Sequence, residues 1–581
     1  MSENEPSKEA NQDNTSEESS PIPEDATSFK PTARFWAILA TLAVIGLLSA
    51  LENTVVTTAL PHIVTELNLG ENYIWVTNVF FLTGAAVQPL FGQLANIFGR
   101  RWVTMVIVAL FTLGSGIAGG ASNGAMLIAG RAVQGMGAGG IYIIIDIIIS
   151  DLVPLRQRGN YIAVILVIYT IGLAIGPWVG GEIVATTTWR WVFYINLPIG
   201  ALSLLLIYLF LHVTHTRTHT LAQKLRRIDI LGNILLISST VSILYALTYA
   251  NTSPSLSWSS PHILTPLLLG LCLGLPSFIF YERFPLEPII PTMLFRNRTS
   301  ALILADTFLN SALLYWVLFF LPVYFQAVLG ASPPRAGVLL LPAIPFGLPG
   351  AVVAVLLMTK FGRYKPLHLI GFGANLIGMG LFTLLDQSSS LATVVLFQAV
   401  AAVGSGFVLN TLLPAVQAQL EEKYQAQVTA AWSFMRSFGS IWGVAIPAAI
   451  LGTRFEKLAR ERIADEQVLG MLLGDGGDGG NGNKGYENAY AEFIWGNIQG
   501  KTREVVVGVY VDALKLIWYV SMGFAAVNLL VAVFEREVVL RTELETEYEM
   551  VEGNRDMHGD GRKRDEEEAV TGGEEEGVEH R

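Results

Sequence analysis

Six ionisable side chains interrupt long apolar stretches of the sequence. They are Glu52, Arg131, Asp146, Glu182, Asp306 and Arg436. A charged group inside a bilayer is costly and normally faces the protein interior or a partner. Burial favours the neutral form of a carboxylate and a nearby guanidinium favours the ionised form, so a changing partner lets the group bind and release a proton. Each of these residues is therefore predicted to be a proton-binding or substrate-binding site, or else to form a structural ion pair or lie at the membrane interface.

The expected depth of these residues differs. Asp146 follows Arg131 by fifteen residues, which places it on a similar helix face about 22 Å further along. It is either a second proton-binding residue or a solvated residue at the cytoplasmic mouth. Glu182 and Asp306 are expected near the membrane interface. Arg436 is expected to make an interior contact in the middle of its helix.

The composition predicts that transmembrane helices hold these residues. Of 581 residues, 52% are hydrophobic and 15% are charged, whereas a soluble domain carries about 25% charged residues. A run of about 20 apolar residues spans the hydrocarbon core. Fourteen such runs begin near residues 35, 73, 103, 125, 161, 192, 230, 262, 302, 336, 367, 392, 428 and 514. The eighth, which contains Pro276, and the tenth, which contains Pro342, Pro345 and Pro349, are the least regular.

Basic residues predict the orientation of the helices. Fifteen Lys or Arg residues lie in one set of loops, whereas the short loops on the other side hold only Arg190 and Arg335. Because cytoplasmic loops collect basic residues, the first set and both chain ends are predicted to be cytoplasmic. Residues 1–33 carry eight acidic and two basic side chains, and residues 537–581 carry sixteen and six. Such acidic segments predict disordered tails and imply no nucleic-acid partner.

A repeat divides the chain. Phe98-Gly99-Arg100 recurs as Phe361-Gly362-Arg363, an offset of 263 residues that also carries the first predicted helix to the ninth. Repeated six-helix halves are a transporter plan with the substrate site near the midplane between them; chance recurrence of three residues is the alternative. The predicted domains are a tail (1–33), an N-terminal half (34–212), two intervening helices with flanking loops (213–298), a C-terminal half (299–535) with an outer loop (452–513), and a second tail (536–581).

Three segments combine glycine with arginine or proline. The predicted gating residues are Gly92, Asn96, Gly99, Arg100, Arg101, Gly176, Pro177, Gly180 and Gly181. The remaining segment, Arg131–Gly140, lies in the fourth predicted helix, and Asp151 is predicted in the loop that follows this helix. Small residues let helices approach closely, and proline makes a helix bendable. For each segment taken alone, ordinary close packing is the alternative.

In this order the segments resemble the loop, Arg-Gln-Gly and antiporter motifs of the major facilitator superfamily. Leu51–Pro61, Trp189–Pro198 and Leu321–Gln326 further resemble its fourteen-helix drug:proton antiporter family, in the fungal multidrug and toxin efflux branch. The resemblance implies an all-α polytopic membrane protein with two six-helix halves plus two intervening helices. It also implies that Glu52 and Arg131 pair or relay protons.

Two positions depart from the family pattern. Asn96 stands where the loop motif usually has Asp, which leaves only a neutral hydrogen bond for a contact that the family attributes to charge. Glu52 stands where the first-helix motif usually has Asp, which keeps the charge and lengthens its reach by one methylene group.

An aromatic stretch predicts part of a pocket for flat apolar compounds. The candidate pocket residues are Tyr142, Gln134, Tyr315, Trp316, Phe319, Gln326, Asn410 and Arg436. Lipid-facing packing and an aromatic belt explain the same aromatic residues equally well.

These features favour a proton-coupled exporter of small, mostly apolar compounds that works by alternating access. An importer of siderophores or vacuolar amino acids shares the helix layout, and a non-transporting sensor is the alternative from another class. We expect no enzyme activity, cofactor or metal, because the sequence shows no clustered His/Cys set, phosphate loop or nucleophile elbow. We expect a monomer in the plasma membrane, with the vacuolar membrane as the alternative. Asn251-Thr252-Ser253 matches an N-glycosylation acceptor on a short outer loop.

Overall fold

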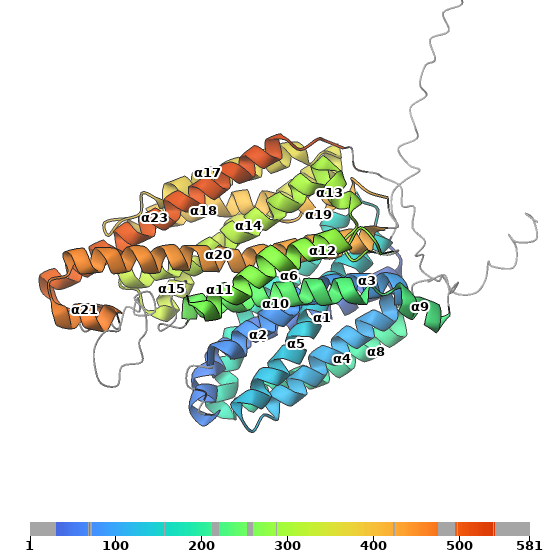
Figure 1. Cartoon of the computed structure of the whole chain (residues 1–581), viewed down its shortest axis with the longest axis horizontal. Helices are drawn as coiled ribbons and strands as arrows, with labels where there is room; N and C mark the ends of the chain where they lie inside the picture. The colour runs from blue at the N-terminus through green and yellow to red at the C-terminus, as the bar shows by residue number, and fades with distance from the viewer. Residues whose placement is uncertain are drawn as a thin grey trace, which may run out of the picture.

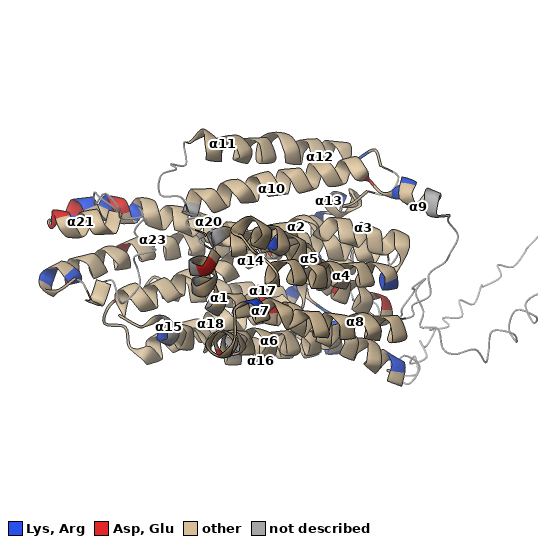
Figure 2. Cartoon of the chain, turned by 90° about the horizontal axis from the view of Figure 1, so that it is seen from below, with Lys and Arg blue, Asp and Glu red and all other residues tan. Residues whose placement is uncertain are grey.

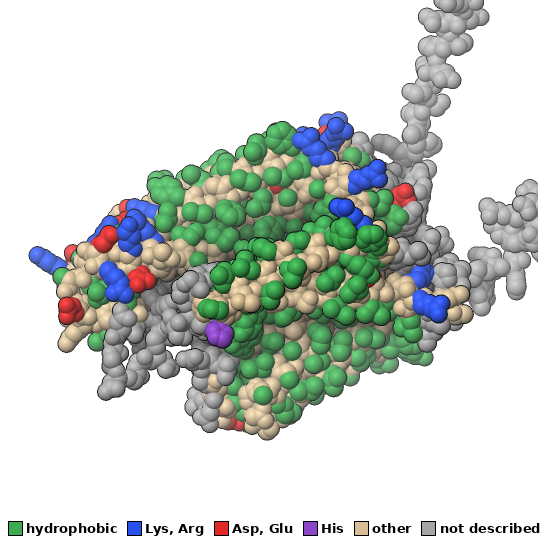
Figure 3. Space-filling model, in the orientation of Figure 1, with side chains coloured by type: hydrophobic (Ala, Val, Ile, Leu, Met, Phe, Trp, Pro, Cys, Tyr) green, Lys and Arg blue, Asp and Glu red, His purple; other side chains and the backbone are tan. Residues whose placement is uncertain are grey.

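The structure is a computed structural model of the chain. It describes residues 31–67, 69, 73–155, 157–211, 220–252, 260–285, 288–421, 424–473, 494–496, 498–538 and 540. Every regular element within these residues is a helix, and twelve helices are long and apolar enough to cross a bilayer. Figure 3 shows hydrophobic side chains along the flank of the bundle and Lys and Arg side chains towards its ends. The expected all-α architecture is therefore confirmed.

The N-terminal half consists of the helices that precede residue 211. They are α1 (Ala33–Leu67), α2 (Tyr73–Ala86), α3 (Gln88–Phe98), α4 (Arg100–Gly119), α5 (Gly124–Leu152), α6 (Arg158–Thr186), α7 (Arg190–Tyr194) and α8 (Asn196–Phe210). The intervening helices are α9 (Leu221–Arg227), α10 (Ile230–Thr252), α11 (Pro261–Leu268), the π-helical turn η2 (Leu269–Gly274), α12 (Leu275–Tyr281) and α13 (Met293–Arg296).

The C-terminal half begins at Arg298. Its helices are α14 (Arg298–Val323), the π-helical turn η3 (Tyr324–Val328), α15 (Pro333–Leu340), α16 (Ala343–Phe361), α17 (Lys365–Phe382), α18 (Leu391–Leu409), α19 (Leu412–Gln417), α20 (Gln425–Arg462), α21 (Glu466–Leu473) and α23 (Gly500–Val533). Figure 1 shows α9 at one end of the bundle and α21 at the other. We call these the predicted cytoplasmic end and the predicted outer end.

Two of the fourteen predicted spans are not among the twelve long apolar helices. The second is divided at Val87, just before Pro89, into α2 and α3. The eleventh coincides with α17, where Lys365, His368 and Asn375 lower the apolar character. The count of fourteen spans therefore stays a prediction.

Proline accounts for the irregular helices. Pro342 separates α15 from α16, and η2 lies directly before Pro276. Because proline lacks an N–H and its ring clashes with the preceding turn, a widened π-helical turn accommodates it. Both irregularities fall in the spans for which the sequence predicted them.

The two halves repeat the same pairwise packing. In the first half, α1 packs on α6, α2 on α5, and α4 on α5 and α8; in the second, α14 packs on α20, α16 on α18, and α17 on α18 and α23. The pairs correspond under the 263-residue offset as far as α20, and α23 follows in the same order after the longer outer segment of the C-terminal half. Gly99 and Gly362 follow α3 and α16 with φ of 88° and 66°, a region that glycine enters without strain. The Phe-Gly-Arg repeat thus marks equivalent turns in the two halves.

The two intervening helices lie against one side of the boundary between the halves. On α10, Tyr245 stacks on Trp75 of α2 with ring centroids 5.8 Å apart, and Ile243 and Leu247 pack with Ala445 of α20. Figure 2 shows α11 and α12 outside α10. One helix outside the repeat therefore contacts both halves.

The outer segment 452–513, predicted as a loop, is helical at both ends. Helix α20 continues to Arg462, and α23 begins at Gly500. Phe455 and Tyr510 pack against each other with ring centroids 4.5 Å apart. This apolar contact explains why the two helices extend beyond the predicted spans. The glycine-rich stretch 474–480 lies outside the described residues.

Candidate functional site

A buried ion pair joins α1 to α5. Glu52 and Arg131 are exposed by 0% and 2%, and Arg131 Nη1 donates to Glu52 Oε1. Asn196, at the start of α8, donates from Nδ2 to the other carboxylate oxygen at 2.5 Å. Glu52 and Arg131 are thus in contact, and their role in proton coupling stays a prediction. In the sequence, Asn196 was named only as part of a motif. Its place near Pro198, as a polar residue at the start of the sixth predicted helix, is the feature of the sequence that could have identified it.

Arg131 is also held by groups other than Glu52. Its Nε donates to the Val76 carbonyl at 2.9 Å, and its Nη1 donates to Gln134 Oε1 at 2.7 Å. The guanidinium lies over the Phe80 ring, 4.2 Å from the ring centroid. Gln134 in turn donates to Ser115 at 2.7 Å, so this predicted pocket residue belongs to the buried pair. The arginine therefore keeps partners when the charge of Glu52 is removed.

A second polar group begins at the next residue of α1. Asn53 Nδ2 donates to the hydroxyl of Tyr142 on α5 at 2.9 Å and to the hydroxyl of Tyr169 on α6 at 2.7 Å. The two tyrosine hydroxyls also contact each other. All three side chains are half-buried. Tyr142 was a predicted pocket residue; Asn53 and Tyr169 were missed, because apolar helices give no sign of which polar residue meets which.

The C-terminal half faces this tyrosine group. Tyr315 of α14 and Arg436 of α20 lie close enough to Tyr142 for electrostatic interaction. Arg436 also interacts with Asp146, which is 8% exposed, and its guanidinium covers the Trp432 ring at 4.6 Å. The interior contact expected for Arg436 is therefore observed. Asp146 is buried rather than solvated.

Of the other predicted pocket residues, Phe319 contacts this group, because its ring stacks on Tyr315 with centroids 6.1 Å apart. Trp316 is fully buried and packs on Phe524 of α23, with ring centroids 5.6 Å apart, inside the C-terminal core. Phe319 is 49% exposed. Gln326 lies half-buried in η3 and Asn410 is buried at the end of α18. The predicted aromatic stretch is thus divided among the interior, the core and the surface.

The predicted gating residues lie at close helix contacts. A Cβ on Gly92 would lie 2.3 Å from the Cβ of Ala430 on α20, and one on Gly176 would lie 1.9 Å from the Thr54 hydroxyl on α1. Gly180 is buried, a Cβ on Gly181 would have nothing within 4 Å, and the Pro177 side chain lies outside the described residues. Gly92 therefore packs one half directly against the other.

The arginines of the first motif bind within the N-terminal half. Arg100 Nε pairs with Asp151 at 2.7 Å, and Arg101 Nη2 donates to the Tyr208 carbonyl at 2.7 Å. The prediction that Asp151 lies in a loop is wrong, because α5 continues to Leu152 and this buried pair keeps Asp151 in the helix. Asn96, which replaces the usual Asp, is half-buried.

Polar side chains join the two halves at the predicted cytoplasmic end. Arg158 of α6 donates to Gln417 Oε1 at 2.9 Å and to Gln425 Oε1 at 3.1 Å, and Gln417 donates to Ser150 at 2.8 Å. Arg158 is 1% exposed. The sequence assigned it only to a basic loop, since its partners lie more than 250 residues away. Together with Gly92, these contacts close the halves against each other at this end.

Three further predictions concern the ends of helices. Glu182 is exposed near the end of α6, as expected for the interface. Asp306, expected near the interface, is fully buried, because α14 already begins at Arg298. Asn251 lies in the last turn of α10, and its side chain and Ser253 are outside the described residues, so its glycosylation stays a prediction. Among the described residues, no group of three or more His, Cys, Asp or Glu side chains is arranged to hold a metal ion.

Comparison with known proteins agrees with this geometry. A family model described as Major Facilitator Superfamily matches residues 42–444. The chain is 48% identical over 538 residues to the MFS-type transporter TwmF of Talaromyces wortmannii, covering 92% of this chain and 95% of that protein. It is 41% identical over 549 residues to the MFS-type efflux pump LUC4 of a Fusarium species, covering 94% and 95%.

Solved structures show the same fold. The proton:xylose symporter XylE bound to 6-bromo-6-deoxy-D-glucose matches with a TM-score of 0.55 at 14% identity, covering 89% of this chain and 99% of that one. The human organic anion transporter MFSD10 matches with a TM-score of 0.52 at 13% identity, covering 86% and 100%. The family model, the relatives and the repeated helical halves lead to one conclusion: the chain belongs to the major facilitator superfamily and is an integral membrane transporter of small molecules.

Proposed function

We propose that this protein is a proton-driven exporter of small, mostly apolar compounds. The observation that carries the proposal is that two adjacent residues of α1 belong to two different polar groups. Glu52 lies in the buried pair with Arg131, and Asn53 holds Tyr142 and Tyr169 where the C-terminal half approaches. A compound that binds against the tyrosines shifts Asn53, and the same helix carries that shift to Glu52.

A proton that binds Glu52 neutralises the carboxylate, yet it does not leave the Arg131 guanidinium without interactions. The neutral carboxyl no longer attracts Arg131 as an ion, but the arginine retains the Val76 carbonyl, Gln134 and the Phe80 ring. A buried charge with remaining hydrogen bonds avoids most of the cost of an unpaired ion. Two states of similar stability, one protonated and one ionised, are what alternating access driven by protons requires.

The direction of transport follows from which end must open. Cargo from the cytoplasm reaches the tyrosine group only after the contacts of Arg158 and Gly92 between the halves separate. In the proposed cycle, loss of the Glu52 proton to the cytoplasm precedes cargo binding, and a proton from outside releases the cargo. The names of two relatives, the efflux pump LUC4 and the efflux pump FUS6 of Gibberella moniliformis, support export rather than import. We place the protein, as a monomer, in the plasma membrane.

Reconstituted vesicles with an imposed pH gradient test this proposal. Uncharged apolar fluorescent dyes such as Nile red serve as probes of cargo movement. We expect the wild-type protein to move dye against the direction of proton flow, and Glu52→Gln to bind dye but lose the dependence of flux on the gradient. Glu182→Gln, which neutralises an exposed carboxylate on α6, is the matched control and should behave as wild type. Dye moving with the protons, or Glu52→Gln with an unchanged gradient dependence, would refute the proposal.

A further inference from the structure

Two buried carboxylates face each other at the predicted cytoplasmic end of the C-terminal half. Asp306 of α14 is 0% exposed, and Glu535, two residues after the end of α23, is 2% exposed. The Asp306 carboxyl group interacts electrostatically with that of Glu535. Yet both oxygens of Asp306 and Oε1 of Glu535 have no hydrogen-bond donor among the described residues. Two adjacent ionised carboxylates cannot both be stable in such a place.

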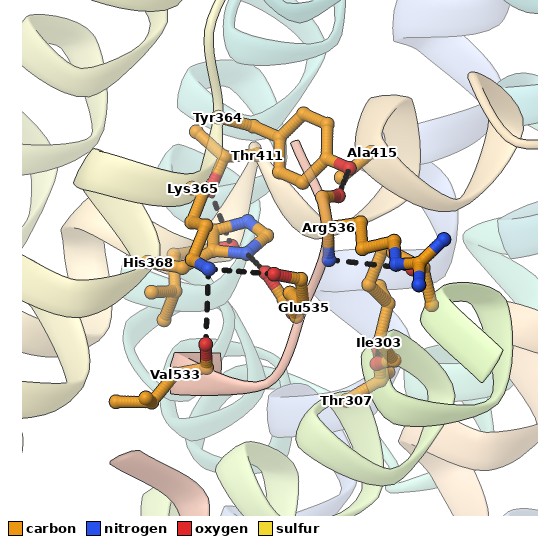
Figure 4. Close-up of polar contacts among 12 residues, drawn as sticks. Ile303, Thr307, Tyr364, Lys365, His368, Thr411, Ala415, Val533, Glu535 and Arg536 are labelled. Carbon is orange, nitrogen blue, oxygen red and sulfur yellow. Dashed lines mark hydrogen bonds and ion pairs between the residues drawn. The ribbon is translucent and has the colours of Figure 1, made fainter. Parts of the chain in front are cut away.

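A third titratable group completes the cluster. His368, in the first turn of α17, is 0% exposed, and its Nδ1 lies 2.8 Å from Glu535 Oε2. Figure 4 shows the imidazole and the Glu535 side chain pointing toward each other between α17 and the segment after α23. The other ring nitrogen, Nε2, has no partner among the described residues. A single ring proton, on Nδ1, is therefore enough for the hydrogen bond from the histidine to Glu535.

The nearby basic side chains are engaged elsewhere. Lys365 Nζ donates to the backbone carbonyls of Val533 and Glu535 at 2.9 and 2.6 Å. Val533 is the last residue of α23, and the carbonyls at the C-terminal end of a helix attract a cation. The Arg298 guanidinium lies over the Phe534 ring at 5.5 Å. Arg296 of α13, Arg363 before α17, and Arg536 and Glu537 after α23 are exposed, and Arg436 of α20 interacts with Asp146. The hydroxyl of Tyr364 is a further titratable group that interacts with Glu535. The carboxylates thus lack a guanidinium of their own.

We propose that Asp306 and Glu535 share one proton and, with His368, form a proton-binding site that is separate from Glu52. A single proton between the carboxylates turns their repulsion into an O–H···O hydrogen bond and supplies the missing donor. With that proton, one negative charge remains and Lys365 lies beside it. A metal ion is not the ligand that this group fits, because the described residues contain no cluster able to hold one.

The site is not a general requirement of the fold. Under the 263-residue offset, Asp306 corresponds to Ala43 and His368 to Met105. The N-terminal half therefore packs its equivalent helices with apolar side chains. The acidic pair is an addition that is specific to the C-terminal half, where it costs stability unless it is protonated.

The shared proton stabilises the packing of the segment that follows α23, which contains Glu535, Arg536 and Leu540. Around Glu535, the Arg536 amide donates to Thr299 Oγ1 at 3.3 Å, and the Tyr364 hydroxyl donates to the Arg536 carbonyl at 2.5 Å. The Leu540 amide donates to the Gly362 carbonyl at 3.1 Å. Loss of the proton restores two facing charges at the centre of these contacts. A rise in cytoplasmic pH therefore releases residues 535–540 from α14 and α17.

Infrared spectroscopy of the purified full-length protein tests the site without any transport assay. In a Glu52→Gln/Glu282→Gln background, which removes the carboxyl of the proposed transport site and a carboxyl whose pKa burial raises to about 7, a protonated-carboxyl C=O band should persist at neutral pH. We expect Asp306→Asn and Glu535→Gln, added singly, each to abolish this band. Glu537→Gln, which removes an exposed carboxylate two residues away, should leave it unchanged. Thermal unfolding adds a second readout: the melting temperature should fall with rising pH when the pair is intact and stay level in Asp306→Asn.

The outcomes separate this site from the proposed transport function. A band that survives in both Asp306→Asn and Glu535→Gln, or its absence from the parent, overturns the shared proton. If one of these two variants does not fold, the band and the pH dependence of the melting temperature in the other variant decide the question. Failure of Glu52 in vesicle transport leaves these results unaffected, because the two sites lie on different helices.

Discussion

Replacing Arg131 by methionine should destabilise the protein much more than replacing both members of its ion pair. In the wild type, Arg131 pairs with Glu52, and Asn196 is the other donor to that carboxylate. Arg131→Met leaves Glu52 buried with Asn196 alone. Removing one partner of a buried pair costs about 3–5 kcal/mol, because the remaining charge is uncompensated.

The double variant Arg131→Met with Glu52→Gln removes both charges. It leaves the Val76 carbonyl and the Gln134 oxygen without the arginine donor, but the amide introduced at position 52 supplies donors of its own. Net hydrogen-bond contributions are about 1 kcal/mol each. We therefore expect the second substitution to recover about 2–3 kcal/mol, within the range of coupling energies for residues in contact.

Unfolding of the wild type, both single variants and the double variant in mixed detergent micelles, followed by tryptophan fluorescence, measures this cycle. The pair between Arg190 and Glu66 is the control, because its side chains are 29% and 54% exposed at a distance of 3.2 Å. Its double-mutant cycle should give about 0–1 kcal/mol, as exposed pairs do. A double variant no more stable than Arg131→Met would refute the reasoning, as would an Arg131→Met variant as stable as the wild type.

Three other predictions follow from contacts outside the pair. Arg158→Ala removes the donor that holds Gln417 and Gln425 across the halves, so a cysteine introduced at Ser150 should be labelled faster from the cytoplasmic side; unchanged labelling would contradict this closure. Gly92→Val should abolish transport, because its Cβ would lie 2.3 Å from a side chain of α20, whereas Gly181→Ala, with nothing within 4 Å, should leave transport unchanged. Burial raises the pKa of Glu282, just beyond α12, from 4.5 to about 7. Its contribution to stability is therefore present at acidic pH and lost as the pH rises through about 7, and the stability of Glu282→Gln should fall less over this pH range than that of the wild type.

The ion pair was predictable from the sequence, whereas the tyrosine group was not. A buried charge in an apolar helix normally needs a partner of opposite charge. The sequence therefore indicated that Glu52 and Arg131 pair with each other. Hydroxyl and amide groups are tolerated in many places. Nothing in the local sequence distinguishes Asn53, which reaches Tyr142 and Tyr169, from an asparagine that bonds its own helix.

Helix direction explains the errors in the predicted pocket. Tyr315 and Trp316 are adjacent, but successive residues point about 100° apart around a helix. One therefore approaches the N-terminal half while the other enters the C-terminal core. In a soluble helix the polar face would reveal the inner side, but a transmembrane helix is apolar all round. The repeat was easier to predict, because positive φ at Gly99 and Gly362 restricts the residues allowed there.

Helix α10 affects how the boundaries between the halves face the bilayer. The halves meet along two boundaries, one where α3 and α2 approach α20 and another where α6 approaches α16. The stacking of Tyr245 on Trp75 places α10 across the first boundary. On the second, α6 and α16 present exposed apolar side chains such as Ile171 and Leu356. Among the described residues, α10 therefore covers the first boundary and leaves the second one facing the lipid, so the two sides of the transporter differ in the plane of the membrane.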